Sequence, residues 1–162
     1  MGEKPETGRQ MLRHAVATLA YRGAKVVRGS PAAVGVLRIA ETTRTPLEIL
    51  AHMGDLLDWS LFLARGQHVW KDSTPQSWDT EVDRFFQGLA ALDLYLASAE
   101  TLGFPPERIL QGPIADALTH VGQIAILRRL AGAPVRGENY FRADIVVGRV
   151  GPDQPAPRRE FD

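Results

Sequence analysis

The chain has 162 residues, no cysteine, and 19 basic against 19 acidic side chains, so its formal net charge is zero. The absence of cysteine excludes disulfides, thiolate metal ligands and cysteine nucleophiles. A zero net charge argues against general binding to nucleic acid, which needs a basic surface. The length and an apolar fraction of 44% are typical of a globular domain. We therefore predict one domain over residues 1–162, with residues 135–162 forming a C-terminal tail.

No segment has the length and apolar character of a membrane span or a signal peptide. The first ten residues are polar, whereas a signal peptide needs an apolar core. No stretch approaches the roughly 20 apolar residues that a spanning helix requires. We expect a cytoplasmic protein with no membrane partner.

Helical periodicity predicts a first helix from about Thr7 to Arg28, which Ser30 and Pro31 end. The segment from Ala32 to Ala40 is apolar but short, and its pattern fits a helical turn as well as extended chain. Thr45, Pro46 and Glu48 then form a capping-box pattern with proline at the first helical position. This pattern predicts a second helix that ends near Gly66.

His52 lies on a stripe of this second helix that borders the apolar core. The other members of the stripe follow at helical spacing: Leu56, Trp59 and Leu63. On the same helix Asp55 and Asp58 are expected on the solvent side. His52 is therefore expected to lie at the edge of the core.

Two further helical patterns follow. A third helix is predicted from about Ser77 to Leu102, and a fourth from Ile114 to Ala131, ended by Gly132. Pro113 either begins the fourth helix or kinks a preceding turn. In the tail, residues 139–147 carry apolar groups expected to pack, and residues 148–162 are expected to be extended or disordered. These patterns predict an all-α four-helix bundle with an extended C-terminal tail.

Asp116 and His120 lie four residues apart on the fourth helix, so both side chains project from one face, with Gln123 a turn further on. A bundle can place His52 of the second helix opposite them. Two imidazoles and one carboxylate are a common ligand set for a divalent metal with open coordination positions. We therefore predict a metal site formed by His52, Asp116 and His120.

Each of these residues also has a simpler interpretation. Taken singly, His52 and His120 fit hydrogen-bonded core histidines better than metal ligands, and Asp116 better fits a carboxylate that stabilises the N-terminus of its helix. Gln123 fits a core amide or a partner of a metal ligand. His68 has no ligand at a suitable spacing and is interpreted as a surface or structural residue.

Two segments resemble the DinB-like, or YfiT-like, superfamily of damage-inducible helical proteins. Residues 45–59, TPLEILAHMGDLLDW, resemble the second helix of that family, and residues 116–124, DALTHVGQI, resemble its fourth. The resemblance extends from the first helix to about Gly137. It implies a metal bound by three histidines, at the positions of His52, Asp116 and His120 here. Asp116 departs from the family pattern, which usually has histidine at that position.

The resemblance implies a divalent-metal-dependent enzyme, either a thiol-dependent transferase or a hydrolase, of unknown substrate. The expected metal is zinc or nickel, with iron or manganese as alternatives, and the expected partners are a second copy of the chain and a low-molecular-weight thiol or other small molecule. No catalytic residue beyond the metal ligands is assigned. The alternative is a non-catalytic dimeric metal-binding or stress-response module.

Overall fold

The computed structural model describes residues 5–161, and this part of the chain is mostly helical. In chain order the elements are α1 (Pro5–Val27), α2 (Ala32–Gly35), α3 (Pro46–Ala64), α4 (Trp78–Ala97), α5 (Pro106–Ile109), the π-helical turn η1 (Leu110–Ile114), α6 (Ala115–Leu130), β1 (Gly137–Glu138), the 3-10 turn η2 (Tyr140–Arg142) and β2 (Glu160–Phe161). The two short strands pair antiparallel. The predicted all-α class is confirmed.

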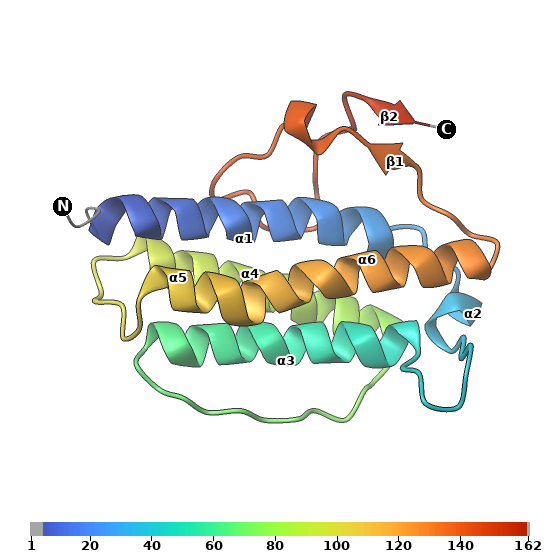
Figure 1. The fold of residues 1–162 in the computed structure, drawn as a ribbon, viewed down its shortest axis with the longest axis horizontal. Helices are drawn as coiled ribbons and strands as arrows, with labels where there is room; N and C mark the ends of the chain where they lie inside the picture. Colours follow the sequence, from blue (N-terminus) through green and yellow to red (C-terminus); the bar gives the residue numbers. More distant parts are fainter. Residues whose placement is uncertain (1–4, 162) are drawn as a thin grey trace.

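The four long helices lie side by side, and their apolar faces meet in one core (Figure 1). Helix α3 packs against α4 and α6, and α1 packs against the same two helices from the other side. The largest fully buried side chains come from every long helix and include Leu19, Leu50, Phe85 and Ile124. Among residues 5–161, no helix is both long enough and apolar enough to cross a lipid bilayer.

The capping box predicted at the start of α3 is confirmed. The Thr45 hydroxyl accepts a hydrogen bond from the Glu48 amide at 3.2 Å, and the Glu48 carboxylate accepts one from the Thr45 amide at 2.7 Å. Pro46 occupies the first turn, where its missing N–H costs nothing. The cap fixes where α3 begins and therefore which of its residues face the core.

Helix α4 ends at Ala97, five residues before the predicted end at Leu102. The chain has to leave the helix here because Gly103 packs directly on the end of α3. The Gly103 amide donates to the Ala64 carbonyl at 2.8 Å, and a Cβ at Gly103 would overlap the backbone of Gly66. This long-range contact leaves no periodic signal in the α4 sequence.

A kink precedes α6. Gly112 has φ −85° and ψ −106°, which is not helical, and Pro113 follows it inside the π-helical turn η1. Of the two roles predicted for Pro113, a kink in a preceding turn is therefore the one observed. Single π-helical turns are frequent near functional sites, and this one delivers the chain into the first turn of α6.

The tail lies across α1 in a defined path (Figure 1). Glu138 anchors it: its side chain is fully buried, accepts a hydrogen bond from the Tyr21 hydroxyl at 2.6 Å, and pairs with Lys25 at 2.8 Å. Packing of the apolar run 139–147 is only partly confirmed, because Phe141 is 97% exposed and Val146 is 49% exposed. Residues 148–161 are irregular, with a turn at Gly148 and bends further on, and they end in strand β2.

Candidate metal centre

Two adjacent helices, α3 and α6, supply the three predicted ligands. His52 lies in the second turn of α3, with 17% of its side chain exposed. Asp116 lies in the first turn of α6 and His120 one turn later, as their spacing predicts. The His120 residue is buried, whereas 46% of the Asp116 side chain is exposed. The group therefore lies at the edge of the core and reaches solvent through Asp116.

A backbone hydrogen bond fixes the orientation of the His120 ring. Its Nδ1 lies 2.7 Å from the Asp116 carbonyl oxygen. Because a carbonyl can only accept, Nδ1 carries the proton, and Nε2 keeps its lone pair for a metal. Metal-binding histidines typically make such a bond through their second ring nitrogen. The local backbone of α6 therefore holds the His120 ring in a tautomer suited to metal binding.

The three side chains converge. His52 Nε2 lies 3.6 Å from Asp116 Oδ2, and the His52 and His120 ring centroids are 4.8 Å apart. One ligand atom from each residue can be chosen so that all three lie within 4.8 Å of one another. His52, Asp116 and His120 thus form a group that could hold a metal ion, and metal binding itself stays a prediction.

The spacing of the donor atoms can be compared with that of known metal sites. Zinc–nitrogen and zinc–oxygen bonds are about 2.0–2.2 Å long, so two ligand atoms on one ion lie at most about 4.4 Å apart. The 3.6 Å separation of His52 and Asp116 satisfies this limit. The widest separation, up to 4.8 Å, has to close by a few tenths of an ångström.

The surroundings of His52 favour its neutral form. Burial of the ring lowers the pKa of His52 below its usual value of 6.5, and the nearby Arg44 and His120 lower it further, while Asp116 acts in the opposite direction. A neutral imidazole is the form that binds metal. The lowered pKa therefore keeps His52 available as a ligand to a lower pH than an exposed histidine.

Replacing Arg44 with glutamine is expected to raise the pKa of His52, because a cation close to the ring is removed. The pKa can be read from the pH dependence of the His52 ring proton in NMR spectra. An Arg129→Gln variant, changed at the far end of α6, serves as the control and should leave the pKa unchanged. An unchanged His52 pKa in Arg44→Gln would contradict this account of the site.

The same lowered pKa predicts how stability depends on pH. Between the folded pKa of His52 and about 6.5, the unfolded chain binds more protons at this residue than the folded chain does. The contribution of His52 to stability is therefore present above about pH 6.5 and is lost as the pH falls through this window.

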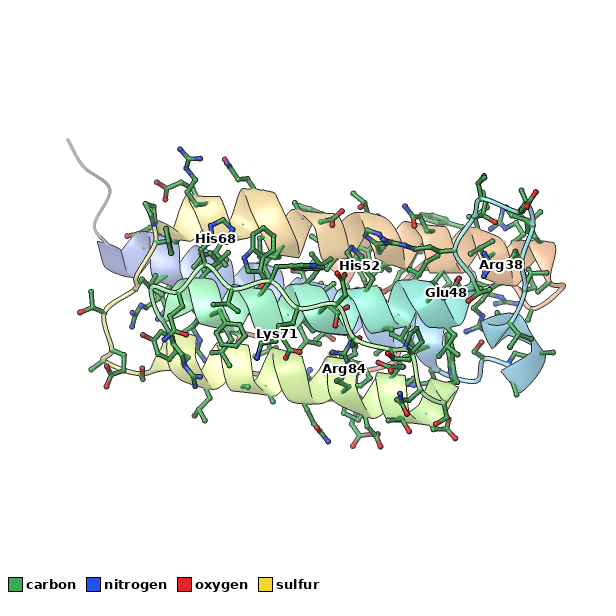
Figure 2. The ribbon with its side chains drawn as sticks, turned by 90° about the horizontal axis from the view of Figure 1, so that it is seen from below. Arg38, Glu48, His52, His68, Lys71 and Arg84 are labelled. Carbon is green, nitrogen blue, oxygen red and sulfur yellow. The ribbon has the colours of Figure 1, made fainter. Side chains whose placement is uncertain are left out.

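Aromatic rings form a wall beside the centre. The Trp70 ring lies 5.6 Å from the His52 ring and 5.7 Å from the Trp59 ring, and His68 stacks on Trp59 at 5.6 Å. His68 and Trp70 belong to the loop that joins α3 to α4, which crosses α3 close to His52 (Figure 2). The wall therefore combines a residue of a core helix with residues of a surface loop.

Two open hollows adjoin the group. One, of about 330 Å³, is lined by His52 together with Arg44 and Asp72. The other, of about 460 Å³, is lined by Asp116, Trp59 and Gly112. A small molecule can therefore reach Asp116 directly, whereas the Trp70 ring covers part of His52.

Two sequence-based expectations near the centre are wrong, and one neighbour was missed. Gln123 is exposed and does not extend the inward stripe of Asp116 and His120, because helical rotation carries it past the α3 contact. Asp55 is only 6% exposed, since Arg84 and the α3–α4 loop cover it. Trp70 was missed because it approaches His52 from a loop, where no periodicity indicates its position.

Comparison with known proteins adds no relative. No protein-family model, no curated protein and no solved structure matches the chain. The function of the chain is therefore inferred from the geometry of the centre.

Proposed function

We propose that the chain is a divalent-metal-dependent enzyme in which His52, Asp116 and His120 hold the ion. The observation that carries this proposal is the convergence of the three side chains from two helices. Zinc or nickel suits the mixed imidazole and carboxylate set, and iron or manganese are the alternatives.

We further propose that α1, α3, α4 and α6 form a DinB-like four-helix bundle. Their mutual packing supports this assignment. The ligands on α3 and α6 also correspond to the second and fourth long helices, on which the resembling motifs lie. In this assignment Asp116 replaces a histidine of the family and supplies a carboxylate oxygen in its place.

The proposed substrate is a low-molecular-weight thiol or another small molecule, and the reaction a group transfer or a hydrolysis. A divalent ion held in the centre would lower the pKa of a thiol or water in its open position. The chain itself supplies a His120 ring fixed by its backbone bond and a His52 ring kept neutral. Trp70 covers the site on the side of the loop.

The alternative is a non-catalytic module, dimeric or stress-responsive, whose metal is structural. Structural zinc sites are usually closed by four protein ligands. Within residues 5–161, the metal-binding group that includes His52 has three members, and none of them is cysteine. An incomplete set with an exposed carboxylate favours an open coordination position, and therefore the enzyme over the structural module.

The proposal is tested by elemental analysis of protein purified without added metal, followed by loading with cobalt(II). One metal per chain and a change in the cobalt absorption spectrum on adding mercaptoethanol are expected, because an open position can accept a thiolate. A protein that binds no metal contradicts the proposal. A cobalt spectrum indifferent to mercaptoethanol, azide and imidazole supports the structural module.

We also propose that two copies form a two-fold dimer, the commonest closed assembly. Phe141 and Val146 of the tail are exposed in the single chain, and a partner would remove their apolar surface from water. Light scattering at micromolar concentration should give twice the chain mass. Phe141→Asp should shift the equilibrium toward monomer, and a monomeric wild type would overturn the proposal.

A further inference from the structure

The α3–α4 loop, residues 65–77, contains no helix or strand and runs along α3 beside His52 (Figures 1 and 2). Its residues are almost all exposed, yet it carries Trp70 against the His52 ring. A long irregular loop with few buried groups has little of its own to hold it in place. Contacts with the helices beneath the loop therefore have to fix its position.

Arg84 of α4 supplies one set of contacts to this loop. Its Nη2 donates to the Ser73 hydroxyl at 2.8 Å and to Asp55 Oδ1, also at 2.8 Å. The second oxygen of Asp55 accepts a hydrogen bond from the Ser73 amide at 3.2 Å. Arg84 and Asp55 thus hold both the side chain and the backbone of Ser73.

Glu81 connects Arg84 to the loop at Gln76, as Asp55 does at Ser73. Its Oε2 pairs with Arg84 Nε at 3.0 Å, and its Oε1 accepts a hydrogen bond from the Gln76 amide at 2.9 Å. Glu81 is 1% exposed and Asp55 is 6% exposed. Two buried carboxylates therefore each connect Arg84 to a backbone amide of the loop.

The path of Arg84 across α3 depends on Gly54. A Cβ at this position would lie 2.6 Å from the Arg84 guanidinium carbon and 2.7 Å from Nη2. Only glycine leaves room for the guanidinium to cross the helix and also donate to the Ala51 carbonyl. Contacts on α3, α4 and the loop thus all meet at this one side chain.

We infer that Arg84 is a positioning residue of the candidate metal centre, and that the α3–α4 loop is a lid. A clamp of three side chains, Arg84, Asp55 and Glu81, holds this lid closed. The inference rests on the proposed function, because it assigns the lid a role in access to the metal. When the clamp holds, Trp70 covers His52. When the clamp opens, the loop swings away from α3 and uncovers the part of the His52 ring that Trp70 contacts.

Cleavage by a lysine-specific endoproteinase measures how often the lid is open. The chain contains three lysines, at positions 4, 25 and 71. Lys25 lies within α1 and is paired with Glu138 and Glu160, whereas Lys71 lies on the exposed loop (Figure 2). Cutting after Lys71 yields fragments 1–71 and 72–162. The protease can cut only when the loop detaches from the helix. The rate of cleavage therefore measures the fraction of molecules in which the loop is open.

Two variants open the clamp in different ways. Arg84→Met removes the guanidinium, and Gly54→Ala displaces it while all the charges stay in the chain. Arg13→Met is the matched control: it breaks the ion pair between Arg13 of α1 and Asp93 of α4, which includes none of the clamp residues. Circular dichroism verifies that each variant is folded.

Both clamp variants are expected to be cut at Lys71 about tenfold faster than the wild type, since charge-assisted hydrogen bonds are lost. Zinc release from the loaded protein to a chromogenic chelator should accelerate by a similar factor. Arg13→Met should change neither rate. Wild-type rates of cutting and release in folded Gly54→Ala and Arg84→Met overturn the inference.

The two measurements, cleavage at Lys71 and zinc release, can fail separately, so failure of the lid can be told from failure of the proposed function. If the wild type binds no zinc, the proposed function fails, and cutting at Lys71 still tests the clamp. If zinc binds and the clamp variants are cut faster but release zinc at the wild-type rate, the loop is a surface strap and its role as a lid is refuted.

Discussion

Replacing His120 with alanine is expected to reduce zinc and nickel affinity by at least about 100-fold, because even a group that only supports a ligand contributes 10–100-fold to affinity. His120 is the buried member of the group, and its ring is held by the Asp116 carbonyl. His52 and Asp116 alone would hold a divalent ion poorly. Equilibrium dialysis against each metal measures the effect, and near-wild-type affinity would refute the role of His120.

Asp116→His is the complementary variant. It restores the histidine that the resembling family has at this position, at the same helical spacing. Zinc or nickel binding is expected to be retained or strengthened, since an imidazole nitrogen is a good ligand for both metals. Asp116→Ala removes the ligand and should weaken binding. Equal loss in Asp116→His and Asp116→Ala would show that the position does not act as a ligand.

The other large effect concerns stability and lies in the tail. Glu138→Gln should lower the free energy of unfolding by about 3 kcal/mol, the scale of breaking a buried ion pair. The Glu138 side chain is fully buried between Tyr21 and Lys25, and in the variant the largely buried Lys25 keeps its ion pair with Glu160. Urea denaturation measures the change. Deleting residues 138–162 should lower the melting temperature for the same reason.

Arg158→Gln provides the control for this prediction. Arg158 also belongs to an ion pair of the tail, with Asp144, but both side chains are exposed. Exposed pairs contribute little to stability, so the melting temperature should stay unchanged. A Glu138→Gln variant as stable as wild type would show that the tail is not docked on α1 through this residue.

Local signals made much of the fold predictable. The capping box of Thr45 and Glu48 identified the start of α3 because all of its atoms lie within one turn. The i, i+4 spacing of Asp116 and His120 fixed their common face for the same reason. The approach of His52 required only that α3 pack against α6.

The features that the sequence did not predict are determined by long-range contacts. Asp55 looks like a solvent-facing carboxylate until Arg84, 29 residues later, is seen to cover it. The end of α4 depends on the packing of Gly103 against Gly66. Trp70 reaches His52 through an irregular loop, whose path follows from the clamp beneath it. Each of these depends on partners that no periodic pattern connects.

Calorimetric titration of zinc and nickel into wild type, His120→Ala and His68→Ala tests the metal centre most directly. His68 lies beside the centre, stacked on Trp59, but does not belong to the ligand group. We expect one binding event per chain for wild type and His68→Ala, and none of comparable affinity for His120→Ala. Identical isotherms for wild type and His120→Ala would contradict this expectation.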